Sequence, residues 1–97
     1  MSKKTPEELA AAIKRYEMKR KPLSMRQTRL ALLDAGLLSG VEDAIANMAE
    51  PEKSKAQIEW EYASTVKRHD PWLISLGTEL GLSEEQIDEL FYNAYQL

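Results

Sequence analysis

Apolar residues recur along most of this chain with the spacing of a helix face. Near the N-terminus, Leu9, Ala12, Ile13 and Tyr16 follow the i, i+3, i+4, i+7 pattern. The segment from Val41 to Met48 has the clearest 3.6-residue period. Strict alternation of apolar and polar residues is longest from Lys55 to Tyr62, inside a segment where we expect a helix, and is shorter elsewhere, so we expect no β-strand.

Residues that commonly begin and end helices divide the chain into short segments. Ser24 with Gln27, and Ser83 with Gln86, have the spacing of capping boxes, in which each side chain bonds the other residue's backbone. We expect helices to begin at Thr5, Ser24, Ser39, Glu52, Asp70 and Ser83, and to end at Pro22, Gly36, Pro51, Arg68 and Gly81. The sequence therefore predicts an all-α fold, a compact bundle of five or six short helices. Residues 1–23 would form a basic N-terminal helix or arm, and residues 24–97 the helical body of a single domain.

The fourth of these helices, from about Glu52 to Arg68, is apolar on two nearly opposite sides. Ile58 and Tyr62 share one side, and Trp60 lies about 200° around the helix from Ile58. Either this is the central helix, packed on both sides, or Trp60 is exposed for binding; we favour the central position. The predicted core comprises Leu30, Leu33, Val41, Ile45, Ile58, Tyr62, Val66, Leu73, Leu76, Ile87, Leu90 and Phe91.

The net charge of −3 conceals an uneven distribution. Residues 1–29 carry nine Lys or Arg and three Glu, whereas residues 30–97 carry four Lys or Arg and thirteen Asp or Glu. A basic arm on an acidic body suits an acidic partner, nucleic acid or the body of a neighbouring copy. The alternative is that the basic residues are only the solvated face of one helix.

The sequence contains no pattern that indicates catalysis, a cofactor or a metal site. There is no cysteine, and the single histidine, His69, has no second histidine with which to share a metal. We expect His69 to have a structural role at the end of the fourth helix. We expect neither an enzyme nor a small-molecule ligand. The longest apolar run, Leu9 to Ile13, is too short to cross a membrane, so a membrane partner is not expected either.

Several motifs from Met25 onward occur in a characteristic order. They are Met25 to Leu38, Ala56 to Ala63, Arg68 to Pro71, Leu80 to Ser83, and Ile87 to Phe91. This order resembles a short helical domain encoded in the tail-fibre and tail-assembly region of tailed bacteriophages and prophages, over about three-quarters of the chain. The resemblance implies a non-enzymatic phage protein that belongs to the tail or assists its assembly. Such a protein would reside in the cytoplasm of the bacterial host, with incorporation into the virion as an alternative. The first 24 residues lie outside the resemblance.

Two functional hypotheses follow. The first is a protein-interaction module of the phage tail or its assembly, acting on another phage protein or on a second copy through an exposed apolar patch that includes Trp60 or Trp72. The second is a nucleic-acid-binding accessory protein that uses residues 14–29. The candidate partner contacts are Arg15, Lys19, Arg20, Arg26, Arg29, Trp60 and Trp72.

Overall fold

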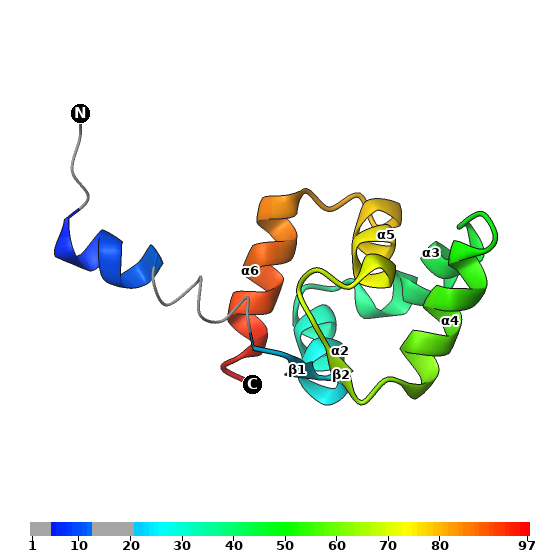
Figure 1. The fold of residues 1–97 in the computed structure, drawn as a ribbon, viewed down its shortest axis with the longest axis horizontal. Coiled ribbons are helices and arrows are strands. Elements are labelled where there is room, and N and C mark those ends of the chain that lie inside the picture. Colours follow the sequence, from blue (N-terminus) through cyan, green and yellow to red (C-terminus); the bar gives the residue numbers. More distant parts are fainter. Residues whose placement is uncertain (1–4, 13–20) are drawn as a thin grey trace.

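The computed structural model describes residues 5–12 and 21–97. Residues 6–12 are helical, and the body that follows is a bundle of short helices with one very small sheet (Figure 1). In chain order the elements are β1 (Leu23–Ser24), α2 (Met25–Asp34), the 3-10 turn η1 (Leu38–Gly40), α3 (Val41–Ala46), α4 (Glu52–Tyr62), β2 (Thr65–Val66), α5 (Pro71–Glu79) and α6 (Glu84–Ala94). The predicted all-α fold class is confirmed.

Both predicted capping boxes are present. At the start of α2, the backbone N–H of Gln27 donates to Ser24 Oγ, and the backbone N–H of Ser24 donates to Gln27 Oε1, each over 3.0 Å. Ser83 and Gln86 make the equivalent pair at the start of α6, over 3.2 and 2.8 Å. These pairs satisfy amides that the first turn of a helix leaves without a partner, which is why the sequence located these starts correctly.

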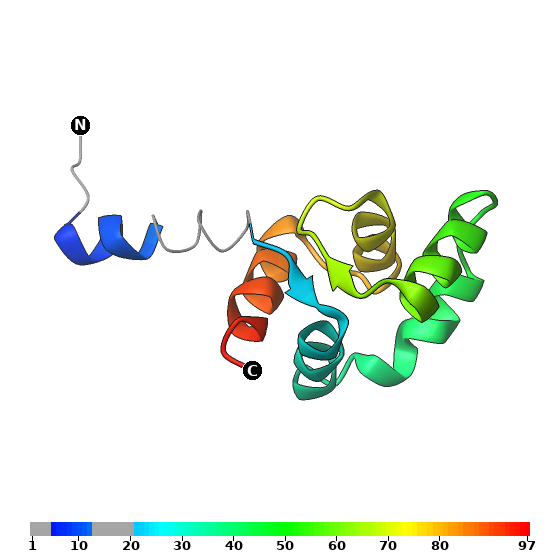
Figure 2. The ribbon, with the colours of Figure 1, turned by 60° about the horizontal axis from the view of Figure 1, so that its bottom comes forward.

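The predicted helix from Glu52 to Arg68 is too long, and the expectation of no strand is wrong. Helix α4 ends at Tyr62, and Ala63 adopts an extended conformation (φ −66°, ψ 134°). Two residues later, β2 pairs antiparallel with β1, with Val66 opposite Leu23 and Thr65 opposite Ser24 (Figure 2). Thr65 and Val66 are β-branched, which suits a strand, but a two-residue pair is too short to produce an alternating pattern.

At two predicted helix starts, the expected residue does not cap the helix with its side chain. Ser39 does not cap α3; it lies inside η1, and Gly40 is the residue at the cap position. Asp70 occupies the cap position of α5, with Pro71 next as expected, but its side chain does not bond that helix. Instead, its carboxylate accepts a 2.8 Å bond from the Lys67 amide, which stabilises the turn between β2 and α5.

The core lies where α2 packs on α6 and where α5 packs on α3 and α4. Its buried hydrophobic residues are Leu23, Ala31, Leu32, Val41, Ala44, Ile45, Met48, Ala56, Trp60, Val66, Trp72, Leu76, Ile87, Phe91 and Ala94. Of the predicted core, Val41, Ile45, Val66, Leu76, Ile87 and Phe91 are buried, whereas Leu30, Leu73 and Leu90 are half-buried. Leu33, Ile58 and Tyr62 are exposed, so these three assignments are wrong.

The wrong assignment of Leu33, on α2, to the core has a simple origin. Four consecutive apolar residues, Leu30 to Leu33, point in directions about 100° apart, so their spacing does not select one face. The face that is buried carries Thr28, Ala31 and Leu32. Burial of Thr28 is tolerated because its hydroxyl donates to the Ser24 carbonyl over 3.0 Å.

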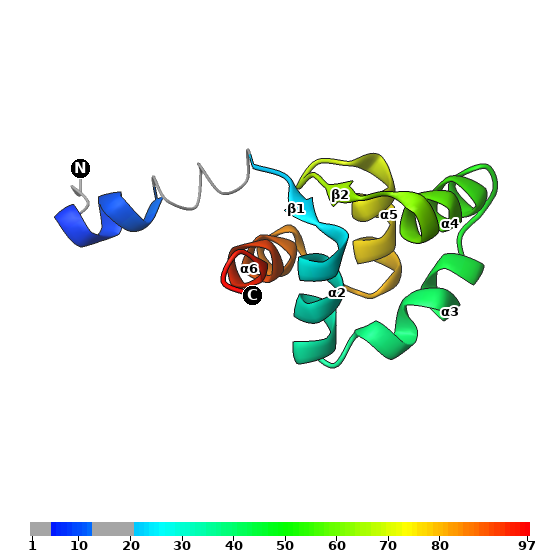
Figure 3. The same cartoon turned by 90° about the horizontal axis from the view of Figure 1, so that it is seen from below.

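Helix α4 is not the central helix of the bundle. It contacts α3 and α5, and it lies at the edge of the body in all three ribbon views (Figure 3). Only one of its sides is buried, the side with Ala56 and Trp60. The prediction that both apolar sides pack against other helices is therefore wrong.

Candidate functional site

Arg29 makes contacts within the body of the protein that hold two helices together. Its guanidinium carbon lies 3.9 Å from the ring centroid of Trp60, and its Nη2 donates a 2.6 Å bond to the Trp60 carbonyl. That carbonyl belongs to the last turn of α4, where no later residue of the helix can serve as its donor. Arg29 thus links α2 to the end of α4 through a cation–π contact and a hydrogen bond.

The two tryptophans are core residues. Trp60 is 6% exposed and Trp72 is 7% exposed, so the expected exposed patch built on either indole is wrong. The interpretation of Trp60 as a core residue is the one that the structure supports. The Trp72 Nε1 is buried and has no hydrogen-bond partner among the described atoms.

The remaining candidate contacts are basic. Arg26 lies exposed on α2, on a different side from the buried Thr28 and Ala31. Arg15, Lys19 and Arg20 lie outside the described residues. Of the four candidates that the structure describes, Arg29 and Trp60 contact each other, whereas Trp72 is buried and Arg26 is exposed, so these four do not form one surface.

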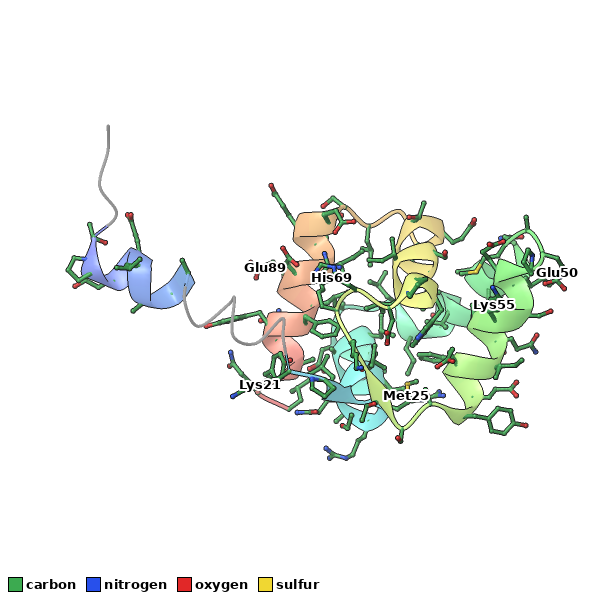
Figure 4. The ribbon with its side chains drawn as sticks, in the orientation of Figure 1. Lys21, Met25, Glu50, Lys55, His69 and Glu89 are labelled. Carbon is green, nitrogen blue, oxygen red and sulfur yellow. The ribbon has the colours of Figure 1, made fainter. Side chains whose placement is uncertain are left out.

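The exposed apolar surface of α4 is formed by residues that the sequence assigned to the core. Ile58 is 57% exposed and Tyr62, one turn further along, is 79% exposed. Lys55 and Glu59 flank them on the same helix, and both are exposed; Figure 4 marks Lys55 on α4. We call Ile58 and Tyr62 the α4 face. Sequence reasoning detected two apolar sides on this helix but could not determine which one the bundle would cover.

The opposite side of α4 borders a groove of about 490 Å³ that it shares with α3 and Arg29. Its charged and polar lining residues include Arg29, Glu42, Lys53, Gln57 and Glu61. Because both signs of charge are present, the lining does not favour a ligand of one charge.

Arg68 is a buried residue that the sequence analysis did not identify. It is 2% exposed, and its Nε donates to Asp88 Oδ1 over 2.7 Å. Its Nη2 donates to Glu84 Oε2 over 2.6 Å and to the Glu84 carbonyl over 3.1 Å. The signal in the sequence was the spacing of Glu84 and Asp88, which places two carboxylates on one side of a helix.

The electrostatic state of Arg68 follows from these contacts. Burial alone would lower its pKa, but the hydrogen bonds and negative charges of Glu84 and Asp88 together raise the pKa above its ordinary value. The side chain is therefore a permanent cation that joins the turn before α5 to the first two turns of α6.

Tyr95 hydrogen-bonds the segment at which the chain enters the body. Its hydroxyl donates to the Lys21 carbonyl, which precedes β1, and burial raises the pKa of Tyr95 above its ordinary value. Phe91 packs edge-on against the Tyr95 ring, with 6.2 Å between ring centroids. These contacts join the last turn of α6 to the point where the chain enters the body.

His69 does not lie at a helix end, because α4 stops at Tyr62; it occupies the turn after β2 and is exposed (Figure 4). Within residues 5–12 and 21–97, no three His, Asp or Glu side chains are placed to hold a metal ion together. In the same ranges no helix has both the length and the apolar character needed to span a membrane. Comparison of the chain with models of known families, with curated proteins and with solved structures found no match.

Proposed function

We propose that this protein is a non-enzymatic interaction module of a phage tail or of its assembly pathway, and that a partner protein docks on the α4 face. The observation that carries the proposal is the exposure of Ile58 and Tyr62 one turn apart on an edge helix. An aromatic ring and a branched aliphatic chain in this position are typical anchors for another protein. The assignment to a phage tail rests on the resemblance of residues 25–97.

The α4 face suits a partner with an apolar patch and polar surroundings. Lys55 and Glu59 would lie at the rim, where charges influence the rate and specificity of association more than its strength. Because neither Ile58 nor Tyr62 contributes to the core, both can be changed without disturbing the fold.

The test is co-purification with the proteins encoded in the same tail region, expressed together with the full chain. We expect one of them to co-purify with the wild type and to be lost with Ile58→Ser/Tyr62→Ser. Leu33→Ser is the matched control, because Leu33 is 57% exposed but lies on α2. Equal recovery with all three forms, or recovery of no tail protein, would contradict the proposal.

Nucleic-acid binding through residues 14–29 is the second candidate, favoured by the concentration of Lys and Arg in residues 1–29. Arg29 is an unsuitable member of that surface, since it already contacts Trp60. We expect any such affinity to fall steeply with salt and to disappear in the Arg15→Gln/Lys19→Gln/Arg20→Gln variant, measured by fluorescence anisotropy with a labelled duplex. Binding that ignores salt, or no binding, would exclude this candidate.

A further inference from the structure

Two charged side chains border the α4 face along the same edge. Lys55 and Glu59 are exposed and lie one turn apart. At 100° per residue, they stand about 60° and 100° around the helix from Ile58, in the same direction, so both lie on one side of the α4 face. Neither side chain forms an ion pair with any of the residues that the structure describes. A positive and a negative group are therefore both available to a molecule that docks on this face.

This pattern of charge is complementary to itself. When two identical helices pack antiparallel about a two-fold axis, the side of the apolar stripe that carries the charges in one helix meets the same side of the other helix. Lys55 then lies opposite Glu59 of the second copy, and Glu59 lies opposite its Lys55. In a parallel pair the charged sides of the two helices point away from each other. The charges thus favour an antiparallel pair.

The apolar residues come together in the same register. Pairing Lys55 with Glu59 puts the two-fold axis level with Gln57, so the two Ile58 residues are only about 3 Å apart along the helices. Tyr62 is then about 4.5 Å along the helix from Lys55 of the second copy, within reach of a cation–π contact between the ring and the ammonium group. One register therefore satisfies both the charges and the apolar side chains.

We propose that, in the absence of another partner, two copies of this protein dimerise through antiparallel α4 helices that cover each other's α4 face. This inference rests on the proposed function, because the second copy and the tail protein compete for the same face. The dimer thus regulates the site, since the copies must separate before a tail protein binds. Helix α4 has 11 residues and is about 17 Å long, so the contact is small and the dimer is weak.

The test is sedimentation velocity of the full chain at concentrations up to about 0.5 mM, because a contact of this size gives weak association. We expect the wild type to change from monomer to dimer as the concentration rises. The variants Lys55→Glu and Glu59→Lys each place like charges at both contacts of the dimer. We expect each variant alone to dimerise with a dissociation constant raised about tenfold.

An equal mixture of the two variants should dimerise as the wild type does, because both contacts between unlike copies then pair opposite charges. This recovery also shows that both variants are folded. The double variant Lys55→Glu/Glu59→Lys exchanges the two charges, so it should dimerise by itself. Glu79→Lys is the matched control, since Glu79 is exposed but lies on α5, and it should leave the dimer unchanged.

The proposal is overturned by a wild type that is monomeric throughout, by single variants that dimerise as the wild type does, or by a mixture that stays monomeric. Its failure differs from that of the proposed function. A monomeric chain from which a tail protein is lost only in Ile58→Ser/Tyr62→Ser overturns the dimer alone. A dimer with the expected response to charge, but with no tail protein recovered, overturns the proposed function alone.

Discussion

At the scale of single residues, Arg68 shows how much depends on one buried charge. Its guanidinium is 2% exposed and bonds Glu84 and Asp88 of α6, while its Nη1 has no hydrogen-bond partner among the described atoms. A buried cation is tolerated only when its partners compensate for the water it has lost. The two carboxylates are therefore needed for the fold to accommodate Arg68.

Asp88→Asn tests this dependence. The substitution keeps the shape of the side chain but removes the negative charge nearest to Arg68 Nε. We expect the free energy of unfolding, measured by urea titration, to fall by about 1–3 kcal/mol, the usual cost of leaving a buried polar group poorly paired. Glu79→Gln, on an exposed position of α5, should change it by less than about 0.5 kcal/mol. Equal effects of the two substitutions would contradict the assigned role of Asp88.

Gly77 is the second residue on which the packing depends. A Cβ atom at this position would lie 2.6 Å from Ile87 Cδ1 and 3.2 Å from Ile87 Cγ1, so α5 and α6 approach closely here. Alanine favours a helix by about 1 kcal/mol over glycine, but an overpacked core costs about 1–3 kcal/mol.

We expect Gly77→Ala to destabilise the protein by about 1 kcal/mol in urea unfolding, because the clash exceeds the gain in helix propensity. In the Ile87→Val background, which lacks the Cδ1 atom, the same substitution should become neutral or stabilising. A double-mutant cycle measures this coupling directly. Additive effects would show that Ile87 does not limit the space at Gly77.

At the scale of elements, α4 is fixed by what lies at its end. Arg29 bonds the Trp60 carbonyl and stacks on the indole, and two residues later the chain leaves the helix for β2. The extended Thr65 and Val66 then pair with β1. A contact from α2 and a two-residue sheet thus end α4 at Tyr62, six residues before the end predicted from the sequence.

Arg29→Met tests this contact. Methionine retains most of the aliphatic stem but neither the charge nor the donor, so we expect a loss of about 1–3 kcal/mol in the free energy of unfolding. The matched control is Arg26→Met, on the same helix but exposed, which should change stability by less than about 0.5 kcal/mol. A loss of the same size in both variants would point to helix propensity or net charge instead.

At the scale of the whole molecule, the body holds the core, and residues 5–12 of the N-terminal segment are not buried in it. Leu9 is exposed, and among the described residues the first one that is buried in the core is Leu23. Removal of residues 1–20 should therefore leave the free energy of unfolding of the body within about 1 kcal/mol of the full chain, with an unchanged denaturant dependence. A clear fall in either quantity would show that the segment packs on its own body.

The sequence predicted the helical class and most helix starts, because these depend on neighbouring residues. The capping boxes at Ser24 and Ser83 and the positive φ angles of Gly36 (74°) and Gly81 (76°) involve atoms only a few positions apart. Six of the twelve predicted core residues are buried for a related reason. Where a single apolar stripe exists, as in α6, it has only one face to bury.

Tertiary structure alone decided which side of α4 is buried and which residues bind Arg68. Helix α4 has two apolar sides, and only the position of α3 and α5 determined that Trp60 would be covered and that Ile58 and Tyr62 would face solvent. The same holds for Arg68, because its partners lie 16 and 20 residues further along the chain and local patterns carry no information about such contacts. Local physics thus fixed where most helices of this protein begin. Packing between distant segments fixed which surfaces remain for another molecule to bind.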